Sequence, residues 1–263
     1  MSLIVWIILF CMIGGVVSVL VASSFLLLSD QSRSRLLPHL VSYAIGAMLG
    51  TAFLAILPHA IESPATDVHQ IMMTVLLGVL SFFLLEKMVL WRHCHAHDCE
   101  VHGEDHAHNH EKGKKSATGM MILIGDGMHN LVDGVLIAAA FLTDIHLGVV
   151  TSIAVATHEI PQELGDFSIL LHSGYSSARA LLFNVLASLT TVVGGVVAYY
   201  TLQGAQDIVP YILAVAAASF IYIAVADLIP GLHHRVEARI TAQQITLIAA
   251  GVVTIFIAHS GLH

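Results

Sequence analysis

Charged side chains are scarce in this sequence. Of its 263 residues only 11% are Asp, Glu, Lys or Arg, where a soluble domain carries about 25%. The mean hydropathy is +0.84, which argues against a soluble globular domain. The net charge is −8 and the chain has no basic patch, so we expect no nucleic acid among its partners. The expected surroundings are a lipid bilayer.

Apolar runs that are long enough to cross a hydrocarbon core of about 30 Å recur along the whole chain. They predict an all-α polytopic membrane protein with eight transmembrane helices, forming a single transmembrane domain over residues 1–263. The predicted spans are 3–28, 38–60, 70–91, 117–142, 146–171, 177–201, 208–230 and 241–260.

The basic residues all fall on one side of such an eight-span chain. They lie in or beside the loops that follow the odd-numbered helices, and the positive-inside rule makes this side cytoplasmic. Both termini are then expected outside, with the protein in the cell membrane. The ten residues are Arg33, Arg35, Lys87, Arg92, Lys112, Lys114, Lys115, Arg179, Arg235 and Arg239.

One long connection, residues 92–116, separates three helices from the other five. Its polar, low-complexity composition predicts a disordered cytoplasmic loop. Cys94 and Cys99 lie there, where thiols stay reduced, and Cys11 lies in an apolar span, so we expect no structural disulfide. Alternating histidines in an acidic loop predict weak metal binding, with a neutral linker as the alternative. These histidines are His93, His95, His97, His102, His106, His108 and His110.

Two predicted helices share a similar ending. The second ends FLAILPHA and the seventh ends VADLIPGL, and the two cross the membrane in opposite directions. Prolines at equivalent places in oppositely oriented halves are typical of an inverted repeat. We expect such a repeat, although prolines near the ends of membrane helices are also common without one.

The fourth and fifth predicted helices concentrate residues that a membrane span normally avoids. The fourth contains GDGMHNLVDG and the fifth contains HEIPQELGDF. At about 100° per residue, His129 and Asp133 share one stripe, and His158, Gln162 and Asp166 share another. Because a short turn joins the two helices, the stripes are expected to face each other at mid-membrane.

These two helices carry carboxylates without basic partners. Each carboxylate costs about 2.5–3.5 kcal/mol at the bilayer centre, and no Lys or Arg lies in the interior of a predicted helix. The groups are therefore protonated, or a cation from outside balances them. Carboxylate, imidazole and amide ligands suit a divalent transition metal such as Zn²⁺. A purely structural hydrogen-bonded network is the alternative. The five carboxylates are Asp126, Asp133, Glu159, Glu163 and Asp166.

Pro161 lies within the second of these motifs. It has no N–H to donate, so the carbonyl of Thr157 is expected to be free beside the polar stripe. A packing kink would explain this proline equally well.

The motifs HNLVDG and HEIPQELGDF resemble the paired signatures of the ZIP (Zrt/Irt-like protein) family of divalent metal transporters. The resemblance is to the branch whose fifth helix reads HEIPHELGDF, and LLFNVLASLTTVVGG and ASFIYIAVADLIPGL extend it over essentially all eight spans. It implies a 3+2+3 arrangement of helices that moves Zn²⁺ into the cytoplasm by alternating access. Fe²⁺, Mn²⁺, Cd²⁺ and Co²⁺ are alternative cargoes, no cofactor is implied, and a homodimer is left open.

The resemblance also implies site residues. His129, Asp133 and His158 would form the principal site, while Asn130 and Glu159 would serve an adjacent one with Asp133 bridging. Three positions are less regular: Gln162 replaces a histidine of the family, Ser188 replaces a carboxylate found in some members, and Met48 is a candidate soft ligand. The full set of candidate metal ligands is Met48, Asp126, His129, Asn130, Asp133, His158, Glu159, Gln162, Glu163 and Asp166.

Two other functions fit parts of the pattern. HExxH on a membrane helix is typical of intramembrane zinc proteases, but this chain reads H-E-x-x-Q and lacks the second histidine. A metal sensor would bind the same ions without moving them. We therefore expect a transporter and no enzymatic activity.

Overall fold

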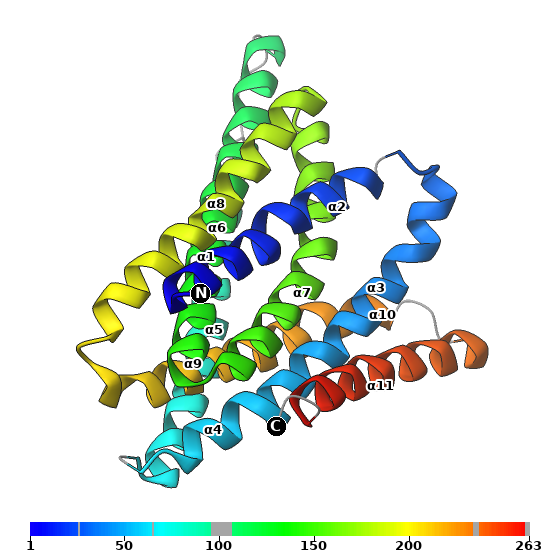
Figure 1. Ribbon diagram of the computed structural model, residues 1–263. Coiled ribbons are helices and arrows are strands. Elements are labelled where there is room, and N and C mark those ends of the chain that lie inside the picture. Colours follow the sequence, from blue (N-terminus) through cyan, green and yellow to red (C-terminus); the bar gives the residue numbers. More distant parts are fainter. Residues whose placement is uncertain (26, 65, 96–106, 234–236, 261–263) are drawn as a thin grey trace.

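Eight helical segments follow one another along the chain (Figure 1). The computed structural model describes residues 1–25, 27–64, 66–95, 107–233 and 237–260, and every regular element within them is helical. The prediction of an all-α chain with eight helices is confirmed. The segments are α1 (Leu3–Met12), η1 (Ile13–Val17) and α2 (Ser18–Phe25); α3 (Asp30–Gly50), η2 (Thr51–Ile56) and α4 (Leu57–Glu62); α5 (Val68–His95); α6 (Ala107–Thr143); α7 (Ile145–His172); α8 (Ser177–Leu202); η3 (Gln206–Ile208), α9 (Val209–Tyr222), η4 (Ile223–Leu228) and α10 (Ile229–Leu232); and α11 (Ala238–Ser260).

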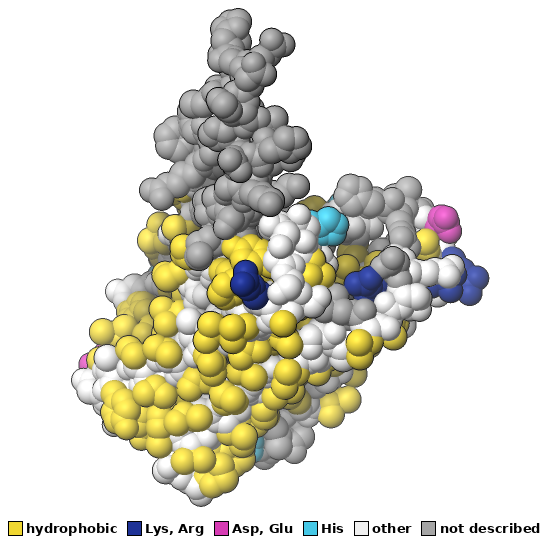
Figure 2. Space-filling model, turned by 90° about the horizontal axis from the view of Figure 1, so that it is seen from above, with side chains coloured by type: hydrophobic (Ala, Val, Ile, Leu, Met, Phe, Trp, Pro, Cys, Tyr) yellow, Lys and Arg dark blue, Asp and Glu magenta, His cyan; other side chains and the backbone are white. Residues whose placement is uncertain are grey.

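Six of the eight segments, within the described residues, are long and apolar enough to cross a membrane. Segments α6 and α7 are outside this set because they carry the polar residues. Large apolar side chains such as Leu84, Phe256 and Ile257 lie more than half exposed on the outside, and Figure 2 shows apolar side chains spread over a broad face. A surface of this kind needs lipid rather than water, so the protein is a multi-pass membrane protein.

Three predicted boundaries differ from the structure by four residues or more. The second segment begins at Asp30 rather than at 38, because Ser29 caps it by accepting a hydrogen bond from Ser32 N–H, and Pro38 lies within α3 without ending it. Segments α5 and α6 also reach into the predicted 92–116 loop. Polar residues cost little helix stability once a helix is nucleated, so residues 92–95 and 107–116 are helical. Residues 96–106, and the side chains of all seven loop histidines, lie outside the described set.

The helices meet through close backbone contacts at glycine. A Cβ on Gly134 of α6 would lie 1.9 Å from the carbonyl oxygen of Thr191 on α8, and a Cβ on Gly194 of α8 would lie 2.0 Å from that of Leu131. Small residues of this kind let membrane helices approach until their backbones touch. Segment α6 consequently packs mainly on α8, and α7 packs on the first segment and on α3.

A single residue joins α6 to α7. Asp144 caps α7, because its Oδ1 accepts hydrogen bonds from the N–H groups of His146 (2.7 Å) and Leu147 (3.1 Å). Partial burial alone would raise the pKa of Asp144, but these two N–H groups hold it below its usual value. The short turn makes α6 and α7 antiparallel neighbours, as the sequence predicts.

Candidate metal centre

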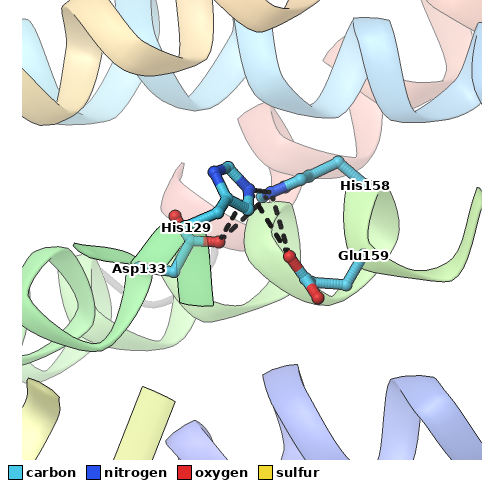
Figure 3. Close-up of side chains that lie close together, drawn as sticks. All are labelled: His129, Asp133, His158 and Glu159. Atoms are coloured by element: carbon cyan, nitrogen blue, oxygen red, sulfur yellow. Dashed lines mark hydrogen bonds and ion pairs between the residues drawn. The ribbon is translucent and has the colours of Figure 1, made fainter. Parts of the chain in front are cut away.

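Four polar side chains from α6 and α7 converge on one point (Figure 3). His129 and Asp133 are one turn apart on α6, and His158 and Glu159 are successive residues of α7. Asp133, His158 and Glu159 are buried, and the His129 side chain is 23% exposed. We call this set the His–carboxylate group.

The spacing within the His–carboxylate group matches a tetrahedral ion. The two histidine Nε2 atoms lie 3.3 Å apart. Asp133 Oδ2 lies 3.2 Å from His158 Nε2 and 3.6 Å from His129 Nε2, and Glu159 Oε1 lies 3.6 Å from each of them. A tetrahedral Zn²⁺ with ligands at about 2.0–2.2 Å separates those ligands by about 3.3–3.6 Å. These five separations are therefore close to those that one bound Zn²⁺ needs.

A backbone carbonyl orients His158 within the group. Its Nδ1 lies 3.0 Å from the carbonyl oxygen of Ala154, so Nδ1 carries the proton and donates it. The lone pair is then on Nε2, the atom that faces the other three ligands. Metal-binding histidines usually show this arrangement, because the second hydrogen bond fixes both the tautomer and the ring.

The carboxylates of the group lack hydrogen-bond donors. Among the described residues, neither oxygen of Asp133 and neither oxygen of Glu159 has a hydrogen-bond partner. Buried polar atoms in proteins are nearly always satisfied, and a buried anion without a partner is very costly. Two such carboxylates, beside the Nε2 atoms of two imidazoles, make a candidate site for a cation.

A second set of carboxylates adjoins the first. Asp126, Glu159 and Glu163 are all buried, and one oxygen of each lies within 4.8 Å of the others. We call this set the carboxylate group. Glu159 belongs to both groups, which places them side by side between α6 and α7.

Asn130 takes part in a buried hydrogen-bond network between α6 and α8. Its Nδ2 donates to Asp126 Oδ1 (3.0 Å), and its Oδ1 accepts from Thr191 Oγ1 (2.7 Å). Gln162 Nε2 lies 3.5 Å from the same Oδ1 of Asp126. Both amides thus orient Asp126, and neither belongs to the His–carboxylate group.

The remaining candidates are not members of either group. Asp166 is half-buried on α7, outside both groups, and Met48 is fully buried in α3 within the apolar core. Ser188, noted in the sequence only as a missing carboxylate, donates from Oγ to Glu163 Oε1 at 3.0 Å. Nothing in the local sequence marks Thr191 or Ser188 as part of the site, since small polar residues on an apolar helix often bond only to their own backbone.

Comparison with known proteins gives a family match over nearly the whole chain. The family model described as "ZIP Zinc transporter" matches residues 1–259. Zinc transporter ZIP10 of Mus musculus is 38% identical over 154 residues, which cover 57% of this chain and 18% of that protein. Zinc transporter ZIP13 of Pongo abelii is 29% identical over 240 residues (86% and 68%), and zinc transporter YKE4 of Saccharomyces cerevisiae is 29% identical over 221 residues (78% and 64%). The chain spans under a fifth of the length of the ZIP10 relative.

Proposed function

The chain belongs to the ZIP zinc transporter family, and from this premise we propose that it carries Zn²⁺ through the membrane by way of the His–carboxylate group. The observation that carries the proposal is the set of distances of 3.2–3.6 Å between the two histidine Nε2 atoms and two carboxylate oxygens, which have no hydrogen-bond partner among the described residues. His129, Asp133, His158 and Glu159 bind the ion directly. Two carboxylates and two neutral imidazoles leave the loaded site without net charge, which suits its depth in the bilayer.

The distribution of basic residues supports the direction of transport. All ten Lys and Arg residues lie in or beside the loops after the odd-numbered helices, which makes that side cytoplasmic and leaves both termini outside. Zn²⁺ then passes through the cell membrane into the cytoplasm. The proposal also assigns the chain to the branch of the family whose fifth helix reads HEIPHELGDF. It further includes weaker transport of Fe²⁺, Mn²⁺, Cd²⁺ or Co²⁺.

An inverted repeat is supported by two matching irregularities. The π-helical turn η2 comes directly before Pro58, the second residue of α4, and the π-helical turn η4 comes directly before Pro230, the second residue of α10. These two segments are the second and the seventh, the pair in which the sequence shows the similar ending. The match favours two three-helix halves of opposite orientation around α6 and α7.

Helix contacts support the same repeat. The second segment packs on the eighth through α3 and α11, and the seventh packs on the third through α9 and α5. A repeat that places segments one to three on segments six to eight turns one of these contacts into the other. Both contacts are close: a Cβ on Gly46 of α3 would lie 2.0 Å from the carbonyl oxygen of Ile248 on α11, and a Cβ on Gly78 of α5 would lie 2.6 Å from Ala218 Cβ on α9. Halves related in this way provide the rocking motion of alternating access.

The protease alternative does not fit this chain. The family is one of transporters, not of enzymes. In addition, Gln162, which stands where a zinc protease needs its second histidine, lies beside Asp126 and outside the His–carboxylate group. The proposal includes a homodimer, but the second chain would supply no residue of the His–carboxylate group, because all four residues come from one chain.

Uptake by proteoliposomes tests the proposal. The wild-type chain should accumulate radioactive zinc, and His129→Ala, Asp133→Ala and His158→Ala should each abolish the uptake. His146→Ala, at the start of α7 and outside both groups, is the matched control and should transport normally. Normal transport by all three site variants would overturn the assignment of the site. Binding of zinc without uptake by the wild type would favour a sensor.

A further inference from the structure

The helices α3 and α11 lie side by side and run in the same direction (Figure 1). A Cβ on Gly46 would meet Ile248, and a Cβ on Gly50 would meet Ile255, so the contact advances together along both helices. Toward their first residues the two helices diverge (Figure 1). A cavity of about 270 Å³ lies between these ends, and we call it the α3–α11 cavity. Its lining residues are Arg35, Pro38, His39, Ser42, Ile240, Gln243, Gln244 and Leu247.

The polar side chains of the α3–α11 cavity offer N–H donors. Arg35 and His39 come from α3, and two neighbouring amides, Gln243 and Gln244, come from α11. Among the described residues, neither the Arg35 guanidinium nor the Gln243 amide has a hydrogen-bond or ion-pair partner. His39 donates from Nδ1 to the carbonyl oxygen of Arg35 at 2.6 Å, so a proton taken up on its Nε2 would add a second positive charge. The cavity therefore suits a ligand that accepts hydrogen bonds.

The charge around the cavity favours an anion. None of its eight lining residues is Asp or Glu, and Arg239 is exposed one position before the lining residue Ile240. Glu237, also exposed at this end of the chain's last segment, is not part of the lining. Both helices begin here, and the N-terminal end of a helix carries a partial positive charge. A guanidinium binds phosphate oxygens through two parallel N–H groups, so Arg35 fits a phosphate.

The surroundings of the cavity are apolar. Leu36 and Leu37, next to Arg35 on α3, are 43% and 38% exposed. On α11, Ile245 and Phe256 are 61% and 56% exposed, and they lie about three turns apart on the same side of the helix. An apolar strip of this kind leads from the cavity into the lipid that surrounds the helices. The ligand that matches both parts has an anionic head and an apolar tail.

We propose that the α3–α11 cavity binds the phosphate headgroup of an anionic phospholipid, whose acyl chains lie along the exposed side of α11. The cavity is smaller than the about 300–1,000 Å³ of pockets that enclose a whole small ligand, so it holds the headgroup alone. Basic pockets between membrane helices at the cytoplasmic side take headgroups of this class. In the proposed orientation both helices begin at that side, so the lipid belongs to the cytoplasmic leaflet.

Native mass spectrometry of the full chain in detergent tests this proposal, with phosphatidylglycerol and zwitterionic phosphatidylcholine of the same acyl chains as probes. The wild type should retain one phosphatidylglycerol in preference to phosphatidylcholine. Arg35→Ala should weaken the binding of phosphatidylglycerol about fivefold or more, and Arg35→Lys, which keeps the charge, should restore most of it. Arg179→Ala is the matched control. It removes the same charge from the start of α8, outside the cavity, and should bind as the wild type does.

Thermal unfolding in detergent gives a second readout. Phosphatidylglycerol should raise the midpoint of the wild type and of Arg179→Ala, but not that of Arg35→Ala. Because Arg35 is exposed, the three midpoints should agree when no lipid is added, which shows that each variant is folded.

Three results would overturn the lipid site. Equal binding of the two lipids, or of phosphatidylglycerol by wild type and Arg35→Ala, would remove the headgroup from the cavity. Displacement of phosphatidylglycerol by inorganic phosphate would make a free anion the ligand. A dimer that forms in place of the lipid complex and is lost in Arg35→Ala would make a second copy of the chain the occupant. Each would leave the proposed zinc site intact, because no residue of the α3–α11 cavity belongs to the His–carboxylate group.

Discussion

The Nε2 atoms of His129 and His158 lie 3.3 Å apart. The two histidines are 29 residues apart in sequence, and they lie on the antiparallel helices α6 and α7. The carbonyl oxygen of Ala154 accepts the Nδ1 proton of His158, so in the neutral imidazole the lone pair is on Nε2. Two imidazole nitrogens at this distance, beside two carboxylates that have no hydrogen-bond partner among the described residues, are the arrangement on which the proposed zinc site rests.

Ser188→Ala should weaken the binding of a cation by the carboxylate group without removing any of its three carboxylates. The serine Oγ orients Glu163 by donating to Oε1 at 3.0 Å. Loss of such an outer hydrogen bond typically reduces metal affinity about 10- to 100-fold. Mn²⁺ titration followed by electron paramagnetic resonance checks this, with Thr201→Ala on the exposed part of α8 as the control. Unchanged Mn²⁺ affinity would show that Glu163 needs no positioning.

Gln162→His should raise the preference for zinc over manganese. Gln162 lies next to Asp126, so an imidazole there would add a nitrogen ligand to an oxygen-only group. Nitrogen ligands favour Zn²⁺ over the harder Mn²⁺. We expect a gain of about tenfold in the Zn²⁺/Mn²⁺ affinity ratio, equal to about 1.4 kcal/mol. Competition dialysis of the two ions measures it. A ratio equal to that of the wild type would place position 162 too far from the ion.

Gly134→Ala should loosen the contact between α6 and α8. The new Cβ would meet the carbonyl oxygen of Thr191 at 1.9 Å, and backbone cannot move as a side-chain end can. Overpacking of this kind costs about 1–3 kcal/mol. Thermal unfolding in detergent should show a lower midpoint. Gly127→Ala on the same helix, where a Cβ meets nothing closer than 3.9 Å, is the matched control and should be neutral or stabilising.

Asp144→Ala should destabilise the turn between α6 and α7 in a pH-dependent way. Removing a helix cap costs about 1 kcal/mol. Because the folded pKa of Asp144 is lowered, its contribution is fully present above the unfolded value of about 3.9 and is lost as pH falls through the folded value. The stability difference between wild type and variant should therefore be constant near neutral pH and vanish in strong acid.

Asp144→Asn separates the two parts of this prediction. Asparagine also caps helices but does not ionise, so this variant should stay close to the wild type at neutral pH. A difference between wild type and Asp144→Ala that persists unchanged into strong acid would contradict the role of the ionised carboxylate. Stability is measured by thermal unfolding over a series of pH values.

Much of the fold follows from apolar periodicity and length. Those two features predict eight helices, and most of the observed ends lie within a few residues of the predicted ones. The exceptions have local causes. The start of α3 depends on the cap at Ser29, and the extensions of α5 and α6 depend on helix continuing through polar residues, which hydropathy does not detect.

The candidate site is predictable only in part. Helical spacing places His129 and Asp133 on one stripe, and they do come together with His158 and Glu159. Spacing does not say which polar atoms bond to each other. Only the structure shows that Asn130 and Gln162 orient Asp126, and that Ser188 and Thr191 reach in from α8. Those contacts depend on the close approach of α6 and α8 at Gly134 and Gly194, a tertiary feature.

The two helices that carry the candidate ligands are also the two whose described residues fall outside the set of apolar spans. A polar helix of this kind partitions poorly into lipid by itself, because each buried acid opposes insertion. Biogenesis of the protein therefore has to shelter α6 and α7 among helices that are already embedded. Damage to the surrounding scaffold would first appear as a failure to insert the transport core, before any loss of affinity for the ion.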